Sequence, residues 1–236
     1  MKGEYKLKKE YAVFDWDNTV RDGFTLFDWI DYLIEQGILN DSIRAQIDEF
    51  SFRYSIKQIS HDEYAHLACK VYAKEIRGFN YIELKNIARQ YIARDRERIF
   101  GGMDTIFNLL HEKNIDIIII SGAPRIVLDN YKKDFHIRSV RAFKERVAKG
   151  YLNGQVAYNY GYNKYKAMMK LESEYGSKPL FGFGDSNSDI PILEEAIHAF
   201  SFNNSIGNAT RIDTINKSVK NSRLEDILLQ IVRDTI

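Results

Sequence analysis

The hydrophobic positions of the chain follow two patterns, which separate strand-forming segments from a long helical one. Apolar runs, which are typical of buried strands in a parallel sheet, occur at 11–14, 115–120, 180–184 and 199–202. A shorter strand is predicted at 139–143, followed by a hairpin with turn glycines Gly150 and Gly154. Helical spacing predicts intervening helices at about 104–113, 126–135, 163–175 and 224–232. This alternation predicts an α/β fold, a parallel sheet covered by helices on both faces.

The segment from Phe24 to about Phe100 has helical apolar spacing throughout and contains no convincing strand. Ser60 and Glu63 have the spacing of a capping box, and Asn80 with Glu83 repeats it, so two helix starts are predicted there. About four helices are expected, inserted directly behind the first strand. We therefore expect a catalytic core made of residues 1–22 and 99–236, with an all-helical cap formed by residues 23–98.

Composition narrows the class of protein. The chain has 236 residues, 44% of them hydrophobic, which suits one large domain or a domain with an insertion. The formal net charge of +1 disfavours a dedicated nucleic-acid binder. No apolar run approaches the roughly 18 residues of a transmembrane helix, and the N-terminal residues lack a signal-peptide pattern. A single cysteine, Cys69, suits a reducing compartment, so we expect a cytoplasmic protein.

Polar side chains follow three of the predicted strands at the point where each strand ends. Asp15 and Asp17 end the first strand, Ser121 and Gly122 follow the second, and the acidic segment 185–189 follows a later one. Because parallel strands end at one edge of a sheet, where such folds bind ligands, these groups are expected to meet. A lysine at the start of the helix near 163–175, either Lys164 or Lys166, can join them.

The types of residue in this set indicate phosphoryl chemistry. Three carboxylates drawn from Asp15, Asp17, Asp185 and Asp189 would form an all-oxygen site suited to Mg²⁺, and no histidines or cysteines have zinc-site spacing. A serine hydroxyl, a glycine N–H and a lysine ammonium are donors that bind phosphoryl oxygens. The plainer interpretation of the first motif is a strand-end turn whose Asp and Asn side chains cap backbone groups.

Four short motifs follow one another along the chain: Asp15-Trp16-Asp17-Asn18-Thr19-Val20, Ser121-Gly122, Lys164, and Gly184-Asp185-Ser186-Asn187-Ser188-Asp189. Together they resemble the haloacid dehalogenase superfamily of phosphotransferases, which also places a helical cap after the first motif. The form of the last motif and the all-helical cap resemble the branch that contains phosphoserine phosphatase.

The resemblance implies a role for each motif residue. Asp15 would be the nucleophile that forms an aspartyl-phosphate, and Asp17 the general acid and base. The Asp15 carboxylate, the Asp17 carbonyl and Asp185 would hold Mg²⁺, with Asp189 close by. The phosphoryl-binding groups would be Ser121, Gly122 and Lys164.

Phe24 stands where phosphoserine phosphatases carry the glutamate that recognises the substrate amine. We therefore expect a small phosphorylated metabolite other than phosphoserine, with Phe24 and Phe27 contributing to specificity. A cap that moves as a lid, with hinges near Gly23 and Gly101-Gly102, is a further expectation. A phosphotransferase or mutase with the same intermediate, and a non-hydrolytic phospho-binding regulatory module, stay open as alternatives.

Overall fold

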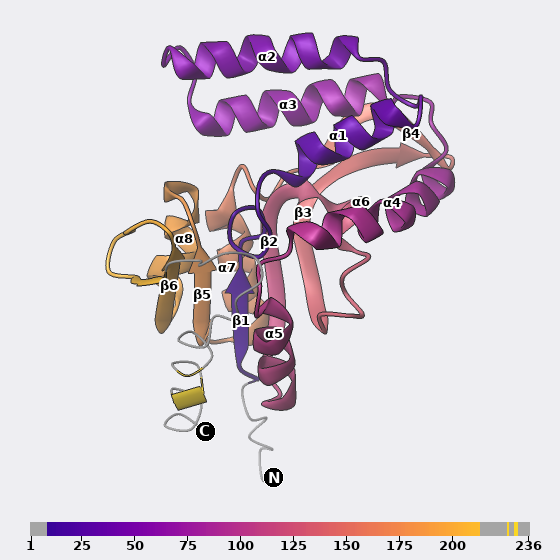
Figure 1. Ribbon diagram of the computed structural model, residues 1–236. Helices are drawn as coiled ribbons and strands as arrows, with labels where there is room; N and C mark the ends of the chain where they lie inside the picture. The colour runs from indigo at the N-terminus through magenta and orange to yellow at the C-terminus, as the bar shows by residue number, and fades with distance from the viewer. Residues whose placement is uncertain (1–8, 213–225, 227–228, 231–236) are drawn as a thin grey trace.

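The structure is a computed structural model that describes residues 9–212, 226 and 229–230 (Figure 1). A seven-stranded sheet has the order β4-β3-β2-β1-β5-β6-β7, and every neighbouring pair is parallel except the β3–β4 hairpin. The strands are β1 (Tyr11–Phe14), β2 (Asp116–Pro124), β3 (Ile137–Ala148), β4 (Tyr151–Tyr158), β5 (Phe181–Gly184), β6 (His198–Phe202) and β7 (Thr210–Ile212). The predicted α/β fold with an inserted helical segment is confirmed.

Side chains of β1 alternate between the two faces of the sheet, as strand geometry requires. Tyr11 and Val13 pack with residues of α7 (Lys164–Tyr175) and α8 (Ile190–Glu195). Ala12 and Phe14 belong to the larger apolar cluster that includes α5 (Met103–Glu112). Burial of all four residues explains why the sequence shows a continuous apolar run rather than an alternating one.

The strands β2 and β5 flank β1, and the register fixes where their polar ends lie. Phe14 pairs with Ile119 of β2 and with Phe183 of β5, so the residues that follow each strand emerge at the same edge. Asp15 continues this pairing, because its N–H donates to the Phe183 carbonyl at 3.0 Å. The sheet therefore brings the three predicted motif segments together.

Four helices fill residues 25–95, as the spacing predicted: α1 (Thr25–Glu35), α2 (Ser42–Ser55), α3 (His61–Glu75) and α4 (Tyr81–Asp95). The reciprocal capping box of Ser60 and Glu63 is present at the start of α3. Asn80 caps α4 by accepting the N–H groups of Ile82 and Glu83. None of the helices that the structure describes is long and apolar enough to span a membrane.

The β3–β4 hairpin is longer than predicted and joins the helical segment to the sheet. Its two-residue turn is Lys149-Gly150, both with positive φ, whereas Gly154 lies inside β4 over the Arg77 side chain, not in the turn. The hairpin rises to the level of α1 and α3 (Figure 1). The Gly78 N–H donates to the Leu152 carbonyl at 2.7 Å, and the Tyr81 N–H donates to the Gly150 carbonyl at 2.9 Å.

The chain passes from the core into the helical segment near Asp22 and returns near Arg98, and these two segments are hydrogen-bonded to each other. Asp22 N–H donates to the Arg98 carbonyl at 2.8 Å, beside the 3₁₀ turn η1 (Arg96–Arg98). Beneath this pairing the fully buried Arg21 guanidinium lies 2.8 Å from Asp95 and 2.6 Å from Asp28. A buried ion pair that loses one partner leaves an uncompensated charge, so this contact ties the crossings firmly.

The structure differs from the prediction at one helix and one strand, and one further predicted helix falls mostly on residues that it does not describe. The helix predicted at 126–135 is shortened to α6 (Arg125–Leu128), because the Asn130 amide donates to the Ile126 and Val127 carbonyls that a continuing helix would use. The short strand β7 was not predicted. The closing helix predicted at 224–232 lies almost entirely outside the described residues.

Candidate active site

Asp15 lies immediately after β1 and is 6% exposed. Its Oδ1 lies 2.7 Å from Lys164 Nζ, and the same ammonium group contacts Asp189. Burial raises the pKa of Asp15 well above its usual range, Lys164 opposes that rise, and the neighbouring carboxylates Asp189 and Asp185 add to it. The site therefore holds more negative charge than its one ammonium group neutralises.

Lys164 rather than Lys166 enters the site. Asn163 caps α7, and Lys164 is the first residue of that helix, with its side chain buried between the two aspartates. Burial alone would lower the pKa of Lys164, but Asp15 and Asp189 raise it overall, so the group stays charged. Lys166 is exposed to solvent, which resolves the choice that the sequence left open in favour of Lys164 as the lysine at the site.

Asp17 turns away from Asp15 toward the start of α1. The Thr25 N–H donates to its Oδ1 at 3.0 Å, and the Thr25 hydroxyl donates to the same atom. Burial raises the pKa of Asp17 to about 6, although Arg21 and Thr25 oppose the rise. A carboxyl group with this pKa can both give and take a proton near neutral pH.

The carboxylates of Asp15, Asp185 and Asp189 each offer an oxygen within 4.8 Å of the others. Asp189 has both oxygens engaged, one by Lys164 and the other by the N–H groups of Asp185 and Ser186. Burial and then Asp189 raise the pKa of Asp185 to about 7. A divalent cation would relieve this repulsion, and hard carboxylate oxygens suit Mg²⁺, so the donor set fits the predicted metal. Asp15 and Asp185 are the members best placed to ligate it, while Asp189 holds Lys164 and the loop.

Contrary to expectation, Ser121 and Gly122 do not follow the strand but lie inside β2 at the irregularity between Ile120 and Pro124, and the Ser121 Oγ accepts the Ala123 N–H at 3.1 Å. Gly161 lies directly against this turn, because a Cβ built there would fall 2.3 Å from the Gly122 N and Cα atoms. Only glycine permits so close a backbone approach. The sequence placed Gly161 just before Lys164 but did not show that it packs against the Ser121-Gly122 turn.

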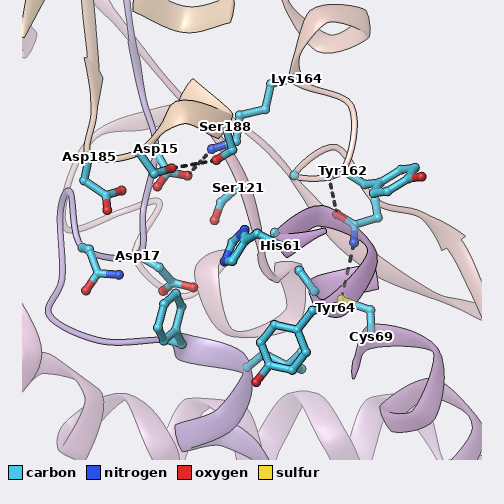
Figure 2. Close-up of a pocket in the computed structure, with 18 of the residues that line it drawn as sticks. Asp15, Asp17, His61, Tyr64, Cys69, Ser121, Tyr162, Lys164, Asp185 and Ser188 are labelled. Atoms are coloured by element: carbon cyan, nitrogen blue, oxygen red, sulfur yellow. Dashed lines mark hydrogen bonds and ion pairs between the residues drawn. The ribbon is translucent and has the colours of Figure 1, made fainter. Parts of the chain in front are cut away.

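These groups line a cavity of about 160 Å³ that also receives residues of α1 and α3. Phe24 and Phe27 line it, as expected of residues that influence specificity. Figure 2 shows Asp15, Ser121 and Lys164 on one side, with Tyr64 and Cys69 on the opposite side. Sequence reasoning missed several lining residues, among them His61, Tyr64, Cys69, Asn159 and Tyr162. The spacing of His61, Ala65 and Cys69 marks one face of a helix, but it does not say what that face covers.

A family model described as haloacid dehalogenase-like hydrolase matches residues 12–194, a span that includes all four motifs. The chain belongs to this family. A search of curated proteins by sequence finds no significant match.

Several solved structures share the fold of this chain. A protein of unknown function from Bordetella pertussis Tohama I superposes with a TM-score of 0.71 and 16% identity, covering 89% of this chain and 100% of that one. The structure of a phospho-aspartyl intermediate analogue of phosphoserine phosphatase superposes with a TM-score of 0.61 and 15% identity, covering 95% of this chain and 99% of that one. Cytosolic 5'-nucleotidase IIIB bound to cytidine superposes with a TM-score of 0.65 and 14% identity, covering 96% of this chain and 87% of that one. At these identities the likeness concerns the fold.

Proposed function

We propose that this haloacid dehalogenase-like hydrolase is a Mg²⁺-dependent phosphomonoesterase that acts through an aspartyl-phosphate on Asp15. The observation that carries the proposal is the buried contact of Lys164 with Asp15 and Asp189, beside Asp185 and the Ser121-Gly122 turn. An anionic nucleophile that meets an anionic phosphate needs positive charge and hydrogen-bond donors in place. Bound Mg²⁺, held by Asp15, the Asp17 carbonyl and Asp185, would supply further charge neutralisation.

In the first step a carboxylate oxygen of Asp15 attacks phosphorus and the bond from phosphorus to the alcohol oxygen breaks. Lys164 holds Oδ1 of Asp15, so we assign the attack to Oδ2. Asp17 donates its proton to the departing alcohol. Ser121, the Gly122 N–H and Lys164 bind the phosphoryl oxygens during transfer.

In the second step a water molecule attacks the phosphorus of the aspartyl-phosphate and Asp17 accepts a proton from that water. The bond from phosphorus to Oδ2 of Asp15 breaks, inorganic phosphate leaves and the Asp15 carboxylate is restored. Splitting the hydrolysis in this way replaces one hard step by two easier ones. The contacts of Asp17 with Thr25 support this role, because they fix the carboxyl group while its pKa lies near 6.

The substrate is a small phosphorylated metabolite other than phosphoserine. Among the described residues that line the cavity, the carboxylates and the ammonium group are Asp15, Asp17, Lys164 and Asp185, all at the phosphoryl end. The ammonium group of phosphoserine would therefore be desolvated without a carboxylate partner beyond that end. We also propose that residues 23–98 form the cap over the active site. We place the protein in the cytoplasm, because the single, buried Cys69 is a free thiol, which suits a reducing compartment.

The test is release of inorganic phosphate from acetyl phosphate and from a set of phosphorylated metabolites, with Mg²⁺ and with a chelator. Asp15→Asn should lower turnover by at least about 10³-fold, because an amide does not attack phosphorus. Asp104→Asn, an exposed aspartate of α5, is the matched control and should keep wild-type rates. Full activity of Asp15→Asn, or of wild type in chelator, would contradict the proposal.

Two alternatives give different products. A phosphotransferase or mutase with the same intermediate would yield a phosphorylated acceptor in place of inorganic phosphate. A phospho-binding regulatory module would become phosphorylated on Asp15 once and then stop. Measuring turnovers per enzyme and identifying the phosphorylated product separates all three.

A further inference from the structure

The part of the cavity beyond the phosphoryl end is built from aromatic rings. Phe24 and Phe27 meet edge to face at 5.9 Å, and Phe27 lies 5.9 Å from Tyr64. Tyr162, from the loop that precedes α7, also lines the cavity, although its ring points away from Asp15 toward His66 (Figure 2). The leaving group of a substrate bound at Asp15 would face these rings, because the phosphoryl group occupies the end that holds Lys164 and Ser121.

Two of these rings are unusually open to solvent. Phe24 is 46% exposed and Tyr162 is 48% exposed, although both line a concave surface. Aromatic residues that only fill a core would be covered, and exposed apolar surface gathered in a concave site marks ligand binding. Trp29 and Tyr72 are fully buried and fill the core of the helical segment, whereas Phe24 does not.

The loop that carries Tyr162 is held in place without a ligand. The Asn159 side chain accepts the Tyr162 N–H at 3.3 Å, and its amide donates to the Cys69 sulfur (Figure 2). The Tyr162 ring stacks on His66 of α3 at 4.7 Å, and Gly161 is locked against the Ser121-Gly122 turn. Rings that are already ordered cost less entropy when a flat ligand binds.

The size of the cavity limits what fits. Its volume is about 160 Å³, and cavities of roughly 150 Å³ hold one benzene molecule. Because the phosphoryl group takes part of this volume, one six-membered ring is the largest group that the rest can hold, and two fused or linked rings would project into solvent.

We propose that the leaving group is an uncharged alcohol that carries one aromatic ring. This inference rests on the proposed phosphomonoesterase function and names its substrate class. Offset and edge-to-face contacts with Phe24, Phe27 and Tyr64 favour an aromatic ring over a saturated ring of similar size. Among the described lining residues beyond the phosphoryl end there is no carboxylate and no ammonium group, and the polar groups there include the His61 imidazole and the Asn159 amide, so an uncharged leaving group is favoured over a charged one.

The test compares esters in which the same kind of bond breaks: benzyl phosphate, cyclohexylmethyl phosphate and phosphoserine. All are phosphates of primary alcohols, so the ring and the charges are the main variables. We expect kcat/KM for benzyl phosphate to exceed that for cyclohexylmethyl phosphate by about 3- to 10-fold, the range given by aromatic pair energies. Phosphoserine should be at least about 100-fold poorer than benzyl phosphate.

Variants identify the rings responsible. Phe24→Leu and Tyr64→Leu should each bring the ratio of benzyl to cyclohexylmethyl turnover toward 1. The matched control is Phe52→Leu on α2, since Phe52 is 62% exposed and does not line the cavity. It should keep the wild-type ratio. An unchanged ratio in both pocket variants would overturn the assignment of these rings.

Failure of the inference and failure of the proposed function give different results. Turnover of acetyl phosphate with no preference for benzyl phosphate, or with phosphoserine as the best ester, overturns the inference alone. Absence of all turnover overturns the proposed function. The ring preference is then decided by calorimetry with benzylphosphonate and cyclohexylmethylphosphonate, which bind without reacting. Several-fold tighter binding of benzylphosphonate supports an aromatic site, and equal affinities refute it.

Discussion

Replacing Glu145 by glutamine should stabilise the protein at alkaline pH and leave its stability almost unchanged at acidic pH. Glu145 lies in β3, where the hairpin meets α3, and it is 2% exposed. Neither carboxylate oxygen makes a hydrogen bond of normal geometry. Burial raises the pKa of Glu145 to about 7, and the backbone N–H of Glu145 and then the Tyr72 hydroxyl oppose the shift only in part.

The sign follows from the direction of the shift. The folded state holds the Glu145 proton more tightly than the unfolded state, so the favourable contribution is complete below pH 4.5. It is lost as pH rises through the folded pKa of about 7. A rise in pKa from 4.5 to about 7 corresponds to about 3 kcal/mol. Glutamine has nearly the same shape and never ionises, so it removes this cost.

The assay is urea unfolding of wild type and Glu145→Gln from pH 4 to pH 8.5. The difference in unfolding free energy should be near zero at pH 4 and reach about 3 kcal/mol in favour of the variant at pH 8.5. Glu49→Gln, at an exposed site on α2, is the matched control and should run parallel to wild type. A constant difference between wild type and Glu145→Gln across this range would refute the reasoning.

Three further predictions follow from the site and the cap crossings. Lys164→Met should lower kcat/KM for acetyl phosphate by at least about 100-fold, whereas the exposed Lys166→Met should keep the wild-type value. Gly161→Ala should lower phosphate turnover by at least about 10-fold, because its Cβ would fall 2.3 Å from backbone atoms of the facing turn. Normal turnover in that variant would contradict the close approach. Tyr131→Phe removes a hydroxyl that donates to the buried Asp95 at 2.7 Å, so urea unfolding should show a loss of about 1–3 kcal/mol.

The sheet and the phosphoryl end of the site could be predicted because their signals are local. A continuous apolar run identifies β1, and parallel topology then places whatever follows Asp15 near whatever follows β2 and β5. Lys164 is recognisable by its place in the order of motifs, but choosing it over Lys166 required the direction of the first turn of α7, which the sequence did not fix.

The rest depends on contacts between distant segments. Helix α6 ends early because the Asn130 amide competes for helix carbonyls. The sequence alone does not show whether an asparagine side chain will bond to the backbone in this way. Gly154 looked like a turn residue but makes room for Arg77, 77 positions earlier in the chain. Tyr162 enters the cavity because its loop packs against α3, a contact without any periodic signal.

The same long-range contacts restrict how the cap can move. A lid that swung only about Gly23 and Gly101-Gly102 would break the backbone hydrogen bonds between 78–81 and the hairpin. It would also pull Arg21 away from the buried Asp95. Losing one partner of such a pair costs about 3–5 kcal/mol, more than a lid can lose on each turnover and still open often. Motion that admits substrate is therefore expected in α2 and the start of α3, whose contacts lie within the cap, while α4 and the hairpin stay with the sheet. Hydrogen exchange should then be faster in 42–62 than in 81–95, and equal slow exchange in both segments would rule this division out.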